Sequence, residues 1–178
     1  MCAPGFPAST DDADKPFLLD HAKALVASGV IVSVIAPAVA GLPLRQTIDG
    51  VNIRRVRYGP QKMETLASTG SMYREARGLK SIMVIPMMIA LCVAMVSEAR
   101  KKSAVLYGHW WIPGGLVAVL AGSLTGRRSV VHLHGSDAAI TTNRVFKIIA
   151  RWVLRRAAVR LAVSDELANW GEELSGRK

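Results

Sequence analysis

The sequence predicts an α/β fold, a Rossmann-like parallel sheet with helices on both faces. Short apolar runs rich in β-branched residues alternate with amphipathic segments, and polar residues collect directly after the apolar runs. Such alternation is typical of parallel strands joined by right-handed helical crossovers. The chain has 178 residues, of which 51% are hydrophobic, so we expect one core and a single domain over residues 1–178.

A helix followed by a buried strand is expected near the amino terminus. Pro16 suits the first turn of a helix, Gly29 suits the position just after its end, and the apolar residues between them follow helical spacing. The β-branched run over residues 30–36 stops at Pro37 and predicts a buried strand.

A second strand is expected over residues 51–58, directly after an Asp49-Gly50 turn. Its apolar residues alternate imperfectly with asparagine and arginine, which indicates a place near the sheet edge with the basic side chains in solvent. Residues 59–80 have no periodicity and predict a long connection, a kind of segment that often carries binding function.

The run over residues 81–97 has no charged residue and contains Pro86. Because a membrane span takes roughly 20 apolar residues, we expect instead a helix over residues 82–98 that is buried in the domain or lies at an interface.

The remaining expected strands and helices alternate along the chain. The expected strands cover residues 104–107, 129–133 and 160–163, and the expected helices cover residues 113–124, residues 143–157 and a segment that begins near Asp165.

Two polar clusters, over residues 108–115 and 132–137, follow neighbouring expected strands. Parallel strands end at one edge of their sheet, and ligands of open α/β sheets bind at that edge. We therefore expect a cleft there, onto which the loop over residues 4–10 should also open. Its expected lining is His109, Trp110, His134, Ser136, Asp137 and Ser164.

His134 is the candidate catalytic residue, because a histidine at a strand end can donate to a phosphate or a sugar hydroxyl, and Gly135 lets a ligand approach the backbone. The alternative is a histidine that bonds a neighbouring carbonyl and only caps its strand. His109 and Trp110 are candidates for ligand contact, since an indole offers an apolar face and one donor, although a tryptophan can also fill the core. Pro113 opens a helix whose free amides could attract an anion, but helix initiation alone explains the proline.

His132 and His134 lie two residues apart and therefore on one face of a strand. Metallohydrolases use this spacing, but they need further ligands. The other histidines of the chain are His21 and His109. We therefore expect no metal site, and we expect His132 to pack in or beside the core.

The chain carries 23 lysines and arginines against 13 acidic residues, a formal charge of +10 that favours an anionic partner. Basic residues recur at helical spacing at Arg144, Lys147, Arg151 and Arg155, beside an apolar face. This stripe either covers the sheet and faces solvent or contacts anionic lipid headgroups. Nucleic acid is not an expected partner, because no helix-turn-helix, RRM, KH or zinc motif is recognisable.

Several enzyme classes and compartments are disfavoured. No G-x-G-x-x-G, Walker A or G-x-S-x-G motif is present, which argues against dehydrogenases, P-loop enzymes and serine hydrolases. Cys2 and Cys92 fit neither a disulfide framework nor a metal knuckle, so a cytoplasmic setting is expected. The first 16 residues mix Pro, Gly and acidic residues, a composition that does not resemble a signal peptide.

The chain resembles the amino-terminal domain of family 4 GT-B-type retaining glycosyltransferases, which build polysaccharides, lipid-linked sugars and glycolipids. The resemblance rests on the order and spacing of four segments that extend over most of the chain. They are DHAKAL at residues 20–25, GHWWIPGG at 108–115, HLHGSD at 132–137 and LAVSDEL at 161–167.

In this family two Rossmann-like domains clasp a nucleotide-sugar donor, and the first domain supplies most of the acceptor side. The resemblance implies that His134 lies near the transferred sugar and the donor phosphates, and that His109, Trp110 and Asp137 line the cleft. Gly135 and Ser136 join them as expected substrate-binding residues. It also implies transfer with retention, no cofactor beyond the nucleotide-sugar co-substrate, and a polysaccharide, lipid-linked or glycolipid acceptor. A peripheral place at the inner face of the membrane fits such acceptors.

Both ends of the chain look cut, and the family's second domain, with its basic phosphate clamp and paired glutamates, is not expected within these residues. We therefore expect an acceptor-side domain that is inactive alone. The first loop also carries ASTDD at residues 8–12 where the family commonly has a Gly-Gly pair. Two alternatives stay open, a non-catalytic basic module that binds anionic membranes and a metal-dependent hydrolase.

Overall fold

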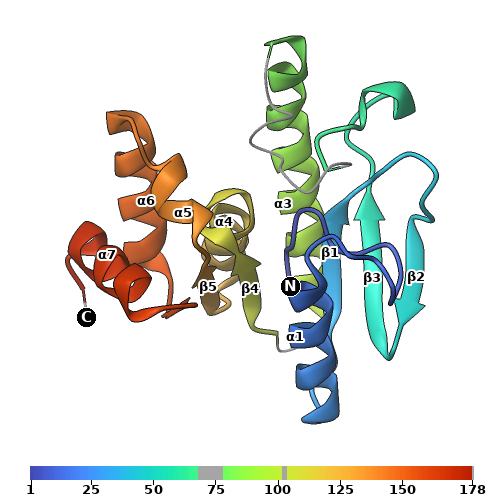
Figure 1. Ribbon diagram of the computed structural model, residues 1–178, viewed down its shortest axis with the longest axis horizontal. Coiled ribbons are helices and arrows are strands. Elements are labelled where there is room, and N and C mark those ends of the chain that lie inside the picture. The colour runs from blue at the N-terminus through green and yellow to red at the C-terminus, as the bar shows by residue number, and fades with distance from the viewer. Residues whose placement is uncertain (68–77, 102–103, 178) are drawn as a thin grey trace. The chain divides into compact units, whose positions relative to one another are not determined.

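The computed structural model describes residues 1–67, 78–101 and 104–177. They form two compact units, one of Met1 with Ala3–Ala94 and the other of Cys2 with Met95–Lys178. Each unit contains a three-stranded sheet with neighbouring helices, as Figure 1 shows. The α/β class is therefore confirmed.

The first unit begins with helix α1 (Pro16–Ala27), close to the expected bounds. Pro16 occupies the first turn, and Gly29, just past the end of the helix, has φ +82°, a left-handed conformation that glycine adopts without strain. Leu18, Leu19 and Ala22 form the buried side of α1.

The sheet of the first unit has the order β1 (Ser33–Pro37), β3 (Val51–Val56), β2 (Arg45–Ile48). β1 runs parallel to β3, whereas β2 pairs with β3 in the antiparallel sense across an Asp49-Gly50 turn. Both turn residues have positive φ, as a two-residue hairpin turn requires.

This sheet corrects three expectations. The first strand begins at Ser33 rather than residue 30 and includes Pro37. The strand over residues 51–56 is the middle strand and not an edge, because the unanticipated β2 covers its other side. Arg55 is not solvated but only 3% exposed, and its guanidinium donates to the carbonyl oxygens of Pro7 (3.0 Å) and Pro43 (3.4 Å).

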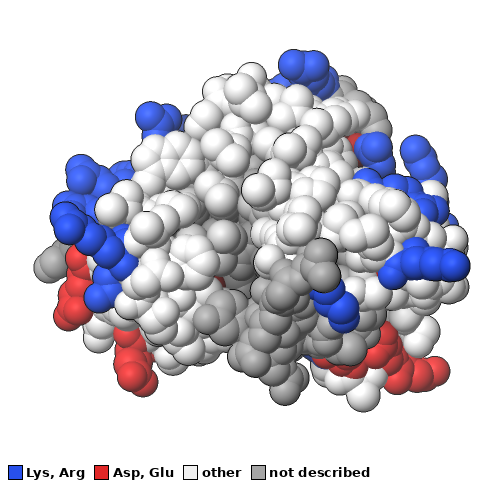
Figure 2. All heavy atoms as spheres, turned by 90° about the horizontal axis from the view of Figure 1, so that it is seen from above, with Lys and Arg blue, Asp and Glu red and all other residues white. Residues whose placement is uncertain are grey.

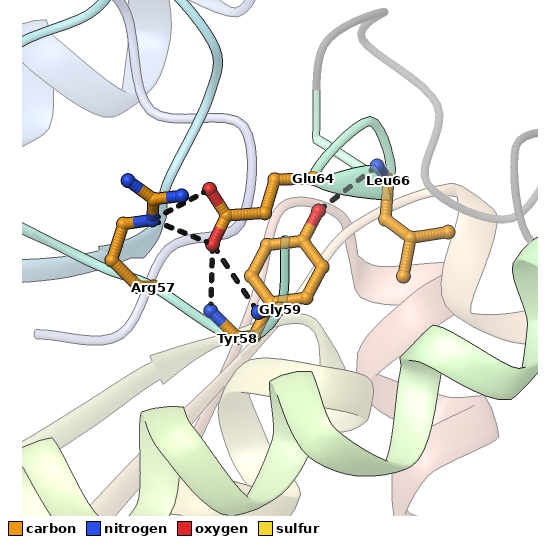
Figure 3. Close-up of polar contacts among 5 residues, drawn as sticks. All are labelled: Arg57, Tyr58, Gly59, Glu64 and Leu66. Atoms are coloured by element: carbon orange, nitrogen blue, oxygen red, sulfur yellow. Dashed lines mark hydrogen bonds and ion pairs between the residues drawn. The ribbon is translucent and has the colours of Figure 1, made fainter. Parts of the chain in front are cut away.

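The first part of the long connection after β3 is held by a buried carboxylate, shown in Figure 3. Glu64, which is 2% exposed, follows the short 3₁₀ turn η1 (Gln61–Met63). It accepts from the backbone N–H of Tyr58 at 2.8 Å and from the Arg57 guanidinium, with 2.9 Å between Arg57 Nε and Glu64 Oε2. The remainder of that expected connection, residues 68–77, lies outside the described residues.

The uncharged run forms a 3₁₀ turn, η2 (Gly78–Met83), and helix α3 (Val84–Lys101). One side of α3 buries Met87 and Leu91, while Ile85, Ile89 and Val93 are exposed. By length and composition the segment Lys80–Arg100 could cross a membrane, and a third of an 18-residue stretch within it is buried in the protein. The expectation of a helix is confirmed, although its first turn is tighter than an α-helix.

The second unit contains a parallel sheet in the order β4 (Leu106–His109), β5 (Ser129–Leu133), β6 (Val159–Ala162), flanked by helices. The helices are α4 (Leu116–Thr125), the short α5 (Ser136–Ile140), α6 (Arg144–Arg156) and α7 (Asp165–Ser175). Its core packs Trp111, Val131, Leu133, Val153 and Leu154 together. The alternation of strands and helices that the sequence predicts is confirmed here, and the unanticipated short helix α5 is added between β5 and α6.

Candidate active site

The candidate active site lies where β4 and β5 end. β4 covers Leu106–His109 rather than the expected residues 104–107. Gly108 and His109 therefore belong to the strand. The parallel register places His109 beside His132, and His134 follows β5 directly. The sheet therefore brings three of the four histidines of the chain to one place.

Two of these histidines form a buried pair. His109 is fully buried and His134 is 7% exposed, and Nδ1 of His109 lies 3.0 Å from Nε2 of His134. At this distance one of the two nitrogens donates a proton to the other, so the tautomer of one ring determines that of its neighbour. His109 thus orients the imidazole of His134.

The third histidine, His132, is half-buried and is held by Tyr107 from β4, with 2.7 Å between the Tyr107 hydroxyl oxygen and His132 Nδ1. Burial raises the pKa of Tyr107 to about 12, so the hydroxyl keeps its proton. One ring nitrogen from each of His109, His132 and His134 lies within 4.8 Å of the others. We call these three residues the histidine cluster.

Trp110 covers the histidine cluster on one side. Its ring centroid lies 4.6 Å from that of His134, and its indole Nε1 donates to Ser136 Oγ at 3.0 Å. Trp110 also has φ +61°, an unusual conformation for a residue with a side chain. Strain of this kind is typical of a side chain that is held in place for function.

Asp137 connects the two strand ends from inside the protein. It is fully buried, and its two carboxylate oxygens accept from the backbone N–H groups of His134 (2.7 Å) and Trp111 (3.0 Å). Burial raises the pKa of Asp137 to about 7, against the opposing effect of these two donors. The carboxylate therefore fixes the backbone at His134 and Trp111, and the expected place of Asp137 in a ligand cleft stays a prediction.

The glycines of this region are explained by close packing. A Cβ on Gly108 would lie 2.3 Å from the carbonyl oxygen of Gly114, and a Cβ on Gly114 would lie 2.3 Å from that of His109. Gly114 and Gly115 belong to the turn η3 (Trp110–Gly115), which is interrupted by extended backbone angles at Ile112 (φ −138°, ψ 136°), and α4 begins only at Leu116. The expected helix start at Pro113 is therefore wrong, because this turn has to pass directly over β4.

Other expected site residues have different settings. Ser136 and Gly135 are exposed, and a Cβ on Gly135 would meet nothing within 4 Å. Ser164 caps α7 by accepting from the backbone N–H of Leu167. The loop over residues 4–10 belongs to the first unit, so its expected opening onto this site stays a prediction.

Sequence reasoning missed Tyr107, which the structure adds to the site. The spacing of Tyr107 could have identified it. Residues 107 and 109 lie two apart and share one face of β4, just as residues 132 and 134 share one face of the neighbouring chain segment. The sequence also led us to expect His132 in or beside the core, whereas the structure places it half-buried beside the other two histidines.

Comparison with known protein families agrees with the expected resemblance. The model of the family described as "Glycosyl transferase 4-like domain" matches residues 16–177, which include α1 and the whole candidate site. No curated protein sequence matches the chain. The chain belongs to the glycosyl transferase 4-like domain family, in agreement with an amino-terminal domain of the GT-B type.

Proposed function

We propose that this chain is the acceptor-side domain of a retaining glycosyltransferase. The enzyme would move a sugar from a nucleotide-sugar to a polysaccharide, lipid-linked or glycolipid acceptor. The observation that supports this proposal most strongly is the His109–His134 pair, a buried and oriented imidazole at the carboxyl end of a parallel strand in a glycosyl transferase 4-like domain. Edges of this kind bind ligands in open α/β sheets.

His134 is the residue to which we assign the chemistry. During transfer the bond between the anomeric carbon and the donor phosphate breaks, and negative charge develops on the leaving phosphate. An imidazole N–H donor, aimed in advance, stabilises developing charge more than it stabilises the ground state. The co-substrate supplies the activated sugar, and the proposed reaction requires no further cofactor.

The surrounding residues have separate tasks in this proposal. The Trp110 indole offers a flat apolar face to a sugar ring, and the exposed Ser136 and Gly135 leave room for it. His109 and Asp137 are positioning residues, because they act on His134 through a ring nitrogen and through the backbone. A second domain that binds the nucleotide would complete the site.

The experiment is to replace His134 in the enzyme that carries this domain and to measure the transfer of labelled sugar from a panel of nucleotide-sugars. The His134→Ala variant should transfer sugar about 100 to 1,000 times more slowly, as expected for the loss of one oriented donor. The His21→Ala variant, altered on α1 in the first unit, is the matched control and should keep its rate. Equal rates for the two variants would refute the role of His134.

A second candidate function, binding to an anionic membrane surface, is favoured by helix α6. Val145, Ile148 and Trp152 are exposed at helical spacing although they are apolar. The exposed basic residues Arg144, Lys147, Arg151 and Arg155 lie beside them on the same helix. Basic side chains are visible over this end of the second unit in Figure 2, on the left of the view. Apolar and basic stripes side by side are typical of interfacial helices.

Vesicle flotation tests this second candidate. Binding should require anionic lipid and should weaken as salt is raised, because attraction between basic side chains and headgroups is screened within a Debye length. Equal binding to neutral vesicles would contradict it. The proposed setting is then the cytoplasmic face of a membrane, where lipid-linked acceptors are also found.

A further inference from the structure

We propose that His109, His132 and His134 form a binding site for a divalent transition-metal ion. One ring nitrogen from each residue lies within 4.8 Å of the other two. Imidazole is the commonest side-chain metal ligand, and three histidines form the ligand set of one class of zinc site.

The backbone brings the three rings together. His109 and His132 are direct neighbours in the β4–β5 register, and His134 is two residues further along the same chain segment. The ring centroids are 4.6 Å apart for His132 and His134, 5.2 Å for His109 and His134, and 5.4 Å for His109 and His132. Because hydrogen-bonded strands fix these positions, a metal ion would need only small rotations of the side chains.

The ligand atoms follow from the hydrogen bonds. His109 Nδ1 and His134 Nε2 face each other at 3.0 Å. Two nitrogens that share one tetrahedral zinc ion at about 2.0–2.1 Å each are about 3.3 Å apart. A metal ion could therefore replace the shared proton with little movement.

His132 would bind through Nε2, because its Nδ1 is already engaged by the Tyr107 hydroxyl at 2.7 Å. Metal-binding histidines almost always donate their second ring N–H to a fixed acceptor, which sets the orientation and basicity of the ring. Tyr107 is such a partner, since its hydroxyl oxygen can accept while its own proton stays in place.

The donor set determines which metal the site would take. Three neutral imidazoles suit Zn²⁺, Cu²⁺, Ni²⁺ or Co²⁺, whereas Mg²⁺ and Ca²⁺ prefer oxygen ligands. The nearby carboxylate of Asp137 accepts from two backbone N–H groups and is thus committed to the main chain. We therefore take Zn²⁺ as the probe and Mg²⁺ as the negative control.

A metal ion on His134 would occupy the ring to which the proposed function assigns the stabilisation of the leaving phosphate. Zn²⁺ should then inhibit the transfer reaction, and a chelator should restore it. This consequence rests on the proposed function, whereas metal binding itself does not. The two are separable, because the stoichiometry of binding is read without any transfer assay.

The experiment is a titration of the chelator-treated chain with Zn²⁺, followed by calorimetry and by metal analysis after dialysis. One ion per chain is expected for the wild type and for His21→Ala, which removes the histidine outside the cluster. The His132→Gln variant should lose this binding. Tyr107→Phe keeps the ring and loses only the hydroxyl, and it should weaken binding about 10- to 100-fold, as is usual for an outer-shell partner of a metal ligand.

His132 is chosen for substitution because it is only half-buried, and circular dichroism will show whether each variant is folded. Visible absorption of the Co²⁺-loaded wild type gives a second readout, since four-coordinate Co²⁺ absorbs strongly and hydrated Co²⁺ weakly. The proposal is overturned if the wild type binds less than one Zn²⁺ per chain, if Mg²⁺ competes equally, or if folded His132→Gln binds Zn²⁺ as tightly as the wild type.

Discussion

Nδ1 of His109 lies 3.0 Å from Nε2 of His134, so the last residue of β4 and the residue that directly follows β5 place two buried imidazoles side by side. Neither ring can rotate without breaking this contact. The relationship brings the segments GHWWIPGG and HLHGSD together in space although 16 residues separate them in the sequence. The tautomers of the two rings are therefore coupled, because only one of the two facing nitrogens can carry the proton.

Removing this contact should slow sugar transfer without abolishing it. His109→Phe keeps an aromatic ring but loses the hydrogen bond, and we expect kcat to fall about tenfold, as for the loss of roughly 1–1.5 kcal/mol. KM should change little, because His109 acts through His134. His109→Asn, whose amide can occupy the position of Nδ1, should recover most of the rate. A purely structural role would instead make both variants equally slow and equally unstable.

Asp137 should stabilise the folded protein, because its carboxylate accepts two buried backbone hydrogen bonds. The Asp137→Asn variant can accept only one of the two backbone N–H groups, from Trp111 and His134, that the carboxylate now satisfies. Leaving the other donor buried should lower the free energy of unfolding by about 1–3 kcal/mol, measured by urea denaturation. The exposed Asp11 allows a control, because Asp11→Asn should leave the midpoint unchanged. Identical midpoints for the two variants would contradict the structural role of Asp137.

The strand-end histidines were predictable because they depend on local pattern and one topological rule. An apolar run followed by His-x-His or Gly-His indicates a strand and its end, and consecutive parallel strands lie side by side. The starts of α6 and α7 were predictable for the same reason, since Asn143 and Ser164 cap them through their own side chains. Local chemistry was sufficient for the two helix starts, whereas β4 covers Leu106–His109 and not residues 104–107 as expected.

Features that depend on distant residues could not be predicted. Arg55 is buried because the carbonyls of Pro7 and Pro43 receive its guanidinium, and neither lies near it in sequence. β2 has only four residues and owes its conformation to pairing with β3. The cluster of three histidines also needed the register of β4 against β5, which the sequence leaves undetermined. In each case a long-range contact outweighs the local pattern.

Substitution of two glycines near the site should affect stability to different degrees. Gly108→Ala would place a Cβ 2.3 Å from the Gly114 carbonyl oxygen, so we expect the free energy of unfolding to fall by about 3 kcal/mol. Gly135→Ala meets nothing within 4 Å and has φ −54°, so its stability should equal that of the wild type. If Gly135 leaves room for substrate, that variant should still transfer sugar more slowly. Thermal unfolding and the transfer assay together separate these effects.

Membrane binding through α6 should depend on the position of charge and not only on its sum. The double variant Arg144→Glu with Arg151→Glu reverses two exposed charges beside the apolar stripe, and we expect affinity for anionic vesicles to fall more than about tenfold. The pair Arg45→Glu with Lys62→Glu, also exposed but in the first unit, makes the same change in net charge. Equal losses in the two double variants would indicate unspecific attraction rather than an α6 surface.

Glu64 should stabilise the residues that directly follow β3, because its buried carboxylate accepts from three groups there. Its oxygens receive the backbone N–H of Tyr58 at 2.8 Å, that of Gly59 at 3.3 Å and the Arg57 guanidinium. In Glu64→Gln the charge that pairs with Arg57 is lost and one oxygen becomes a donor, so we expect the free energy of unfolding to fall by about 1–3 kcal/mol. Hydrogen exchange at the backbone N–H groups of Tyr58 and Gly59 should become faster in the same variant.

The control is Asp49→Asn, which breaks a solvent-exposed pair with Lys23 of similar length, 2.8 Å. It should cause little change in stability, because water screens that pair. Comparable losses in the two variants would mean that burial does not set the contribution of Glu64.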